Sequence, residues 1–388
     1  MTNSFSELTF NTRAFRNPDI VTSLVKQINQ LADGVAESLG RPVQIMEVCG
    51  GHTHAIFHSG IDQLLNENIE FIHGPGCPVC VLPAQAIDKA TWVAQQADTI
   101  LATFGDVLRV PGAKGSLQQI QAQGADIRIL YSPLDVTQLA FDNPTKKIVF
   151  FAIGFDTTMP SIALTIQSAK QQHIQNLKFL CYHIRLMPTL TTLLDTGEAE
   201  LDGFIGPGHV SIVLGSECYQ PIAAKYHKPL VIAGFEPIDV LQALHMLLLQ
   251  LSQQRCEIEN AYSRVVSKQG NVLVQQTMNE VFKNSELNWR GLGNVANSVG
   301  SLQPEYAQFD GSLVAPQSSP CECDDSKYCA DVLIGKRKPN QCPLFGRSCT
   351  PESPLGALMV SSEGACAAYY KYKQIPFNES QPEYSEDA

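Results

Sequence analysis

Four cysteines near the C-terminus have the residue type and the surroundings of metal ligands. They are Cys329, Cys342, Cys349 and Cys366. The stretch that holds them is rich in turn residues and poor in apolar runs, and a cubane iron–sulfur cluster needs four thiolates. Zinc also accepts four thiolates, so the spacing favours a cluster only weakly. Cys321 and Cys323 leave six thiols for four positions.

A second set of thiols lies far upstream, inside glycine-rich turns. Cys77 and Cys80 form a C-x-x-C pair, a spacing that suits a reversible disulfide or two ligands of one metal. No second C-x-x-C pair completes a zinc ribbon, so we favour thiol redox chemistry here. One thiol set is therefore expected to hold a metal cluster and the other to carry out chemistry.

Cys49 belongs to the upstream set and precedes two glycines, which allow the backbone to approach a ligand closely. A helix that begins near Thr53 would place its N-terminus beside the thiol, so we expect a lowered pKa for Cys49. His52 and His54 add candidate proton donors or acceptors. The alternative is a buried cysteine with turn glycines and a surface histidine.

The composition predicts a cytoplasmic protein with two or three domains. The chain has 388 residues, of which 44% are hydrophobic and 17% charged. Its net charge of −11 argues against nonspecific binding to nucleic acid. Met1–Asn17 has no apolar signal core, and Leu241–Leu251 is too short and too polar to span a membrane. Twelve cysteines in such a chain indicate a reducing compartment, where thiols serve as metal ligands or redox groups.

Short apolar runs alternate with segments that can be helices, which predicts buried parallel strands and an α/β fold. The predicted strands are Val43–Val48, Phe71–His73, Thr99–Phe104, Ile127–Tyr131, Lys147–Ile153, Lys178–His183, Gly203–Ile205 and Leu230–Ala233. Two successive sets of four strands suggest two similar domains, over residues 40–143 and 144–236, each with helices flanking a parallel sheet.

The remaining segments, residues 1–39 and 237–388, are predicted to form a third, mainly helical and irregular domain. Apolar spacing predicts a helix over Asp19–Leu39 and one or two helices over Ile238–Gln269. From Gln303 onward Pro, Gly, Ser and Cys are abundant, a composition that cannot bury a large core alone. A metal centre that staples this segment is physically reasonable.

Five glycine-rich loops each follow a predicted strand, the position where doubly wound sheets bind ligands. They are Cys49–His54, Gly74–Cys80, Gly154–Thr158, Gly206–Ser211 and Gly234–Asp239. If both sheets present these ends to a common cleft, the loops converge there. His209 is a candidate ligand or proton donor in this cleft, and a satisfied turn histidine is the alternative.

Acidic and hydroxyl residues in these loops have both a ligand-binding and a structural interpretation. Asp156, Thr157 and Thr158 could hydrogen-bond a ligand or cap the helix that follows. Glu236 and Asp239 are candidate cleft residues, although positions at the start of a helix are the favoured interpretation.

These motifs resemble those of the HypD family, maturation factors of [NiFe]-hydrogenases. The resemblance covers nearly the whole chain, and motifs of this length in one order are highly specific. The segments that carry it are Met46–His54, Gly74–Cys80, Gly206–Ser211, Gly234–Asp239, Cys342–Gly346 and Ser361–Cys366.

The resemblance implies an assembly scaffold more than a turnover enzyme. In that family an iron ion receives two cyanides and one carbon monoxide before delivery to the hydrogenase large subunit. A small HypC-type partner shares the iron through its N-terminal cysteine, and HypE supplies the cyanide. Members have two α/β domains and a third domain that holds a [4Fe–4S] cluster.

Transferred to this chain, the resemblance makes Cys49 the iron ligand, His52 its functional neighbour, and Cys77 and Cys80 a redox pair. The implied cluster ligands are Cys329, Cys342, Cys349 and Cys366, and Val332–Gly335 places the first of them. We hypothesise that electrons pass from the cluster through the thiol pair to the iron site.

The sequence departs from the family pattern at three places. Asp156 stands where the family usually has Glu, which keeps the charge but shortens the reach. Leu358 occupies a position that can be Cys in relatives, so no thiol is required there. Asp324–Tyr328 separates Cys323 from Cys329, which leaves Cys321 and Cys323 as alternatives for the first cluster ligand.

Two other functions use the same thiols. A freestanding iron–sulfur thiol–disulfide oxidoreductase would need the cluster and the C-x-x-C pair, but neither Cys49 nor bound iron. A zinc-stapled interaction protein would have inert upstream thiols.

Overall fold

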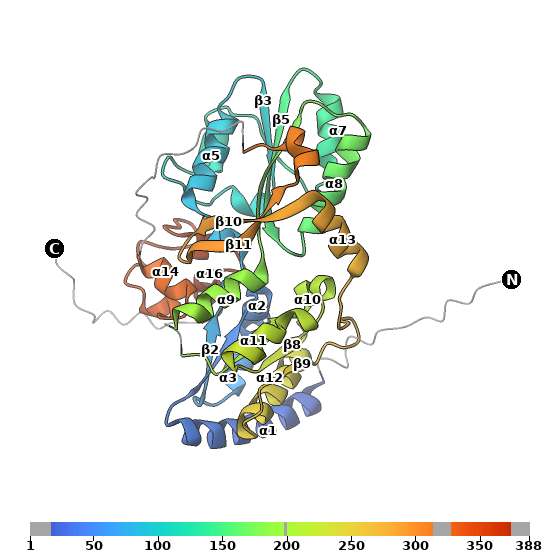
Figure 1. The fold of residues 1–388 in the computed structure, drawn as a ribbon. Helices are drawn as coiled ribbons and strands as arrows, with labels where there is room; N and C mark the ends of the chain where they lie inside the picture. Colours follow the sequence, from blue (N-terminus) through green and yellow to red (C-terminus); the bar gives the residue numbers. More distant parts are fainter. Residues whose placement is uncertain (1–16, 198–199, 313–326, 374–388) are drawn as a thin grey trace.

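The computed structural model describes residues 17–197, 200–312 and 327–373, which form two lobes (Figure 1). Each lobe contains one sheet flanked by helices, so the predicted α/β class is confirmed. All eight predicted strands are present. They are β1 (Val43–Glu47), β2 (Ile69–His73), β3 (Thr99–Thr103), β4 (Ile127–Ile129), β5 (Lys147–Phe155), β6 (Leu177–Ile184), β7 (Gly203–Pro207) and β8 (Leu230–Ala233).

The first sheet is parallel throughout and has the strand order β2-β1-β7-β8-β9, with β9 (Ile258–Asn260) at one edge. Apolar side chains of α1 (Pro18–Leu39) and α12 (Pro237–Ser252) pack on one face. The other face is covered by α9 (Leu186–Thr196), α10 (Gly208–Leu214) and α11 (Gln220–Tyr226). The expectation that α1 and α12 belong with the C-terminal segment is therefore wrong. The helix predicted from Ile238 also ends early, at Ser252, before β9.

The second sheet has the order β10-β11-β6-β5-β3-β4. Strands β10 (Phe282–Trp289) and β11 (Gly293–Leu302) form an antiparallel hairpin that joins β6 through Val299 and Ile184. On one face lie α5 (Ala84–Ala94) and α6 (Leu117–Ala122), and on the other α7 (Asp135–Asp142), α8 (Met159–Gln171) and α13 (Val272–Val281). The hairpin was not among the predicted strands, because half-exposed polar residues interrupt its apolar positions.

The strands are not divided between the sheets at residue 143, as the predicted domains required. The first sheet takes β1 and β2 from the range 40–143 and β7 and β8 from 144–236, and the second sheet takes the four strands between them. The chain therefore crosses from one lobe to the other after β2, after β6 and after β9. An apolar run predicts a strand but not its neighbours, which depend on packing between distant segments.

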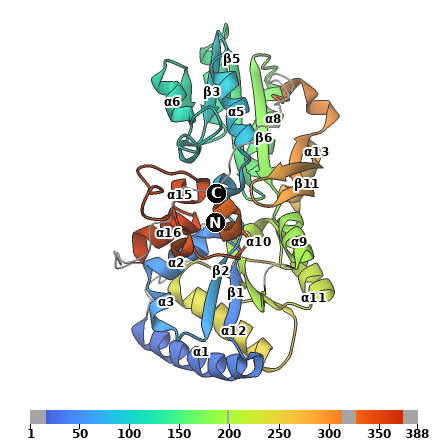
Figure 2. The same cartoon turned by 90° about the vertical axis from the view of Figure 1, so that its left-hand side faces the viewer.

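The C-terminal segment lies at the junction of the lobes, against α2 (Gly50–His58) and α4 (Pro78–Val81) (Figure 2). Its helices are short and linked by irregular chain, as predicted: α14 (Lys327–Leu333), α15 (Ala357–Val360) and α16 (Ala365–Tyr372). The other short elements are α3 (Ile61–Leu64) and 3-10 turns at Gly105–Val107, Glu217–Tyr219, Pro304–Phe309 and Pro339–Gln341. No helix in the described ranges combines the length and the apolar character that a membrane crossing requires.

Candidate functional site

Cys49 is the N-cap residue of α2, at the carboxyl end of β1. Its Sγ accepts a hydrogen bond from the Gly51 N–H at 3.2 Å and lies 3.9 Å from His209 Nε2. The side chain is only 5% exposed. Burial, with the nearby carboxylates of Glu363 and Glu47, raises the pKa of Cys49 to about 12. The expected lowering is wrong, because the loss of hydration outweighs the backbone N–H groups at the helix start.

His52 and His209 both contact the ring of Phe235, near the Cys49 thiol. The ring centroids of His52 and Phe235 are 4.5 Å apart, and those of His209 and Phe235 are 5.2 Å apart. His52 Nε2 donates to the Gly234 carbonyl at 2.9 Å. Burial lowers the pKa of both histidines to about 4, so both are neutral at neutral pH.

Four of the five predicted loops follow adjacent strands of the first sheet, β2, β1, β7 and β8. Because these strands are parallel, their carboxyl ends meet at one edge, which explains how the loops converge. The bond from His52 to Gly234 links the loop after β1 to the loop after β8. The contact between Cys49 and His209 links it to the loop after β7.

The C-x-x-C loop packs directly on the Cys49 loop. A side-chain carbon at Gly76 would overlap the Val48 carbonyl and the Cys49 Cα, so only glycine fits there. Cys77 and Cys80 are buried and form a disulfide with their Cα atoms 5.2 Å apart. The pair therefore lies beside the backbone that carries Cys49.

The fifth loop, after β5, has a structural role. The Asp156 carboxylate is buried, pairs with Arg185, and accepts a hydrogen bond from the Leu186 N–H at 2.8 Å. It therefore caps the start of α9, one of the segments that cross between lobes, and not the helix that follows it. Thr157 lies in the same turn, and Thr158 is the N-cap residue of α8, with its hydroxyl donating to the Phe155 carbonyl.

Three further candidates are His54, Glu236 and Asp239, which lie at or near the starts of helices. His54 does not face Cys49: its Nδ1 is 3.3 Å from the Tyr372 hydroxyl on α16, and its ring stacks on His58. Glu236 is the N-cap residue of α12. Asp239, in the first turn, is buried and bonded to Arg264 at 2.6 Å.

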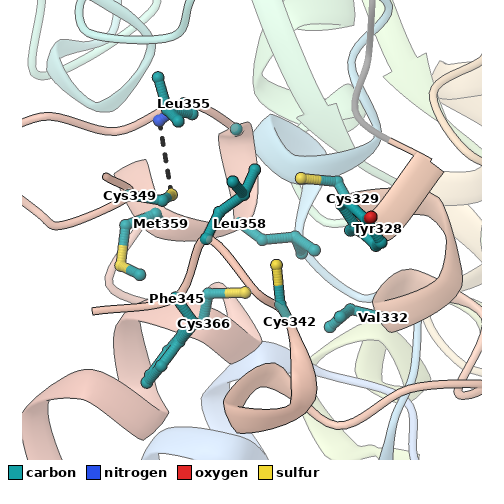
Figure 3. Close-up of a pocket in the computed structure, with 12 residues that line it drawn as sticks. Tyr328, Cys329, Val332, Cys342, Phe345, Cys349, Leu355, Leu358, Met359 and Cys366 are labelled. Atoms are coloured by element: carbon teal, nitrogen blue, oxygen red, sulfur yellow. Dashed lines mark hydrogen bonds between the residues drawn. The ribbon is translucent and has the colours of Figure 1, made fainter. Parts of the chain in front are cut away.

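The four C-terminal cysteines line one pocket (Figure 3). They are Cys329, Cys342, Cys349 and Cys366. A side-chain carbon at Gly356 would lie 2.5 Å from the Cys329 sulfur, so glycine lets this thiol approach the opposite wall. Burial and the three neighbouring thiols raise the pKa of Cys366 well above its usual value. Cys321 and Cys323 lie outside the described residues.

A second pocket, lined in part by the disulfide, adjoins the cysteine pocket. Its lining includes Cys77, Cys80 and His73, and it shares Val332 and Leu358 with the cysteine pocket. The two thiol sets are therefore separated by common apolar side chains.

Sequence reasoning missed Glu47, His73 and Glu363, which also lie at this junction. Glu47 and His73 are register partners on β1 and β2. The Glu363 backbone packs against Gly50 at the start of α2. Each lies inside or beside a glycine-rich motif, but only strand pairing and the position of the C-terminal segment bring them together.

Comparison with known proteins identifies the family of this chain. The HypD family model, described as the hydrogenase formation hypA family, matches residues 19–373. The chain belongs to the HypD family. The hydrogenase maturation factor HypD of Escherichia coli (strain K12) is 51% identical over 362 residues, which cover 93% of this chain and 97% of that protein. HypD of Rhodobacter capsulatus is 48% identical over 364 residues, with coverage of 92% and 97%.

Replacing Gly76 with Ala should destabilise the protein by about 1–3 kcal/mol, because the added methyl group must displace the Val48–Cys49 backbone. Urea unfolding measures the change, and alkylation of Cys49 reports the local disturbance. Gly34→Ala is the matched control, since a side chain at Gly34 meets no atom within 4 Å and should not destabilise α1. Equal stabilities of the two variants would contradict the packing argument.

The metal-free protein should alkylate slowly at Cys49. A pKa shift from 9.0 to about 12 lowers the thiolate fraction near neutral pH by roughly a thousandfold. Iodoacetamide labelling followed by mass spectrometry should give a Cys49 rate that keeps rising above pH 9. In the urea-unfolded chain the rate should level off near the ordinary thiol pKa. The same profile in both states would contradict the burial effect.

Proposed function

We propose that this protein is a scaffold in hydrogenase maturation, on which an iron ion receives two cyanides and one carbon monoxide. Family membership supports the role in maturation. The main support for a scaffold role is that the loops of Cys49, His209 and the C-x-x-C pair meet in one buried junction. A buried junction excludes water from a reactive metal group.

Cys49 is the proposed ligand of the iron, which is cargo here. Cyanide and carbon monoxide favour low-valent iron, and a soft thiolate is a suitable protein ligand for it. Because burial raises the pKa of Cys49, the thiol holds its proton until a metal displaces it. His52 donates to Gly234 and thereby positions the loop that faces the thiol.

The resident cofactor is proposed to be a [4Fe–4S] cluster on Cys329, Cys342, Cys349 and Cys366. The residues fit such a group, since four thiols line one pocket and Gly356 makes room for the Cys329 sulfur. A bound cluster supplies single electrons.

Cys77 and Cys80 are the proposed redox pair, because they lie between the cysteine pocket and Cys49. The proposed partners are a HypC-type protein that shares the iron, HypE as the cyanide donor, and the hydrogenase large subunit as the recipient. Thiol ligands need reducing conditions, so we place the assembly in the cytoplasm. The net charge of −11 speaks against a nucleic-acid partner.

An iron–sulfur thiol–disulfide oxidoreductase is the second candidate. This function is favoured because the pocket at the disulfide and the cysteine pocket adjoin each other. Val332 and Leu358 line both pockets. Such an enzyme would not need Cys49.

Infrared spectroscopy of the anaerobically purified complex with the HypC-type partner separates the two candidates. The scaffold should give cyanide and carbonyl stretching bands that Cys49→Ser abolishes and Cys77→Ala weakens. Cys256→Ser is the control, because this thiol contacts Ala223, away from the site, and should leave the bands unchanged. A wild-type complex without such bands, but with disulfide reductase activity, would support the oxidoreductase.

Cys342→Ser should remove most of the bound iron and sulfide, because a cubane cluster needs all four ligands. Iron and sulfide analysis together with the visible spectrum measures this loss, and Cys256→Ser should retain both. Stoichiometric zinc without sulfide in the wild-type protein would rule out the cluster.

A further inference from the structure

Glu47 and His73 form a buried pair with two unused polar atoms. They lie opposite each other on the parallel strands β1 and β2. Glu47 Oε1 accepts hydrogen bonds from the Thr53 hydroxyl and from His73 Nδ1. Glu47 Oε2 and His73 Nε2 are buried and have no hydrogen-bond partner in the described parts of the chain. Leaving a buried polar atom without a hydrogen bond is destabilising, so two such atoms in one pair call for an explanation.

The pair lies at the pocket that contains the C-x-x-C disulfide. Thr53, His73, Cys77 and Cys80 line this pocket together. The thiol pair and a histidine with an unused nitrogen thus face the same small space.

The charged and titratable groups around His73 come from four elements. Glu47 lies on β1, the two cysteines are in the α4 turn, and Glu363 lines the pocket ahead of α16. Tyr369 of α16 packs edge-on against the His73 ring, with Lys373 above the Tyr369 ring. Burial raises the pKa of Glu47, Glu363 and Tyr369.

Cys77 Sγ and Cys80 Sγ have different surroundings. These determine which of the two sulfurs needs a proton after the disulfide is reduced. Cys77 Sγ accepts a hydrogen bond from the Cys80 N–H at 3.3 Å, so a thiolate at Cys77 is stabilised. Cys80 Sγ lies 3.9 Å from the Ala357 carbonyl oxygen, which opposes a negative charge and accepts from a thiol. Reduction of the disulfide should therefore leave Cys77 as the thiolate and Cys80 as the thiol.

We propose that His73 gives a proton to Cys80 when the disulfide is reduced and removes it when the disulfide forms, with Glu47 and Thr53 as positioning residues. The inference rests on the redox role proposed for Cys77 and Cys80. With Nδ1–H donating to the Glu47 carboxylate, Nε2 is the nitrogen that gains and loses the proton. His73 Nε2 exchanges this proton with Cys80 Sγ directly or through one water molecule.

The step balances with a dithiol as the reductant. One thiolate of the dithiol attacks Cys77 Sγ, the bond between the two protein sulfurs breaks, and its electron pair stays on Cys80 Sγ. His73 Nε2 protonates that sulfur. The second thiol of the dithiol then attacks the mixed disulfide, Cys77 leaves as a thiolate, and the proton released from that thiol returns to His73. The dithiol becomes a cyclic disulfide, and the protein gains two electrons and one proton, which is carried by Cys80.

Timed reduction of the oxidised full-length protein by dithiothreitol tests the proposal, with alkylation and mass spectrometry of Cys77 and Cys80. Rates are divided by the dithiothreitol thiolate concentration, from about pH 6 to about pH 9. The wild-type rate should fall with rising pH, because the proposed step takes up a proton. His73→Gln should reduce the rate at the low end of this range by about a hundredfold or more and flatten the profile.

His58→Gln is the matched control, because it replaces an exposed histidine of α2 and should keep the wild-type rate and profile. Added imidazole should restore reduction in His73→Ala, which a purely structural role would not explain. If the His73 variants prove unstable to urea, Glu47→Gln should show the same flattened profile. A wild-type rate and profile in His73→Gln would overturn this inference alone. A wild-type disulfide that dithiothreitol cannot reduce would overturn the redox role of the pair and this inference with it.

Discussion

The contact between the Gly76 backbone and the backbone of Val48 and Cys49 determines how the thiols of this protein are arranged. It leaves no room for a side chain, so the C-x-x-C turn follows the Cys49 loop at the closest distance that two chains permit. A second contact of this kind joins Gly50 to the backbone of Glu363, which brings the C-terminal segment against the start of α2. These two contacts bring Cys49, the C-x-x-C pair and the segment with the four C-terminal cysteines into one region.

Burial at this junction controls the chemistry of the groups there. Without water, the Cys49 thiol is held protonated and His52 and His209 are held neutral. The metal-free site therefore carries little charge around the thiol, and a cation that binds must displace a proton. The same burial leaves Glu47 and His73 dependent on each other for hydrogen bonding.

The path of the chain explains why the junction contains these groups. The first crossing between the lobes follows β2 and contains Cys77 and Cys80. The second follows β6 and contains α9, whose start is capped by Asp156. Each crossing must pass between the sheets, so its residues are shared by both lobes. The reactive loops themselves leave one parallel sheet, which alone is enough to gather them at a single edge.

Local sequence determined much of this protein. Apolar runs identified all eight main strands, glycine-rich motifs identified the loops around Cys49, and turn-rich composition separated the C-terminal cysteines from the core. These features depend on neighbouring residues, and so they can be read from one segment at a time. Tertiary structure alone decided the exchange of strands between the sheets, the half-exposed hairpin β10–β11, and the raised pKa of Cys49. It also decided that Glu47 meets His73 and that His54 faces Tyr372. Pairing and burial arise between residues far apart in the chain, and no local pattern records them.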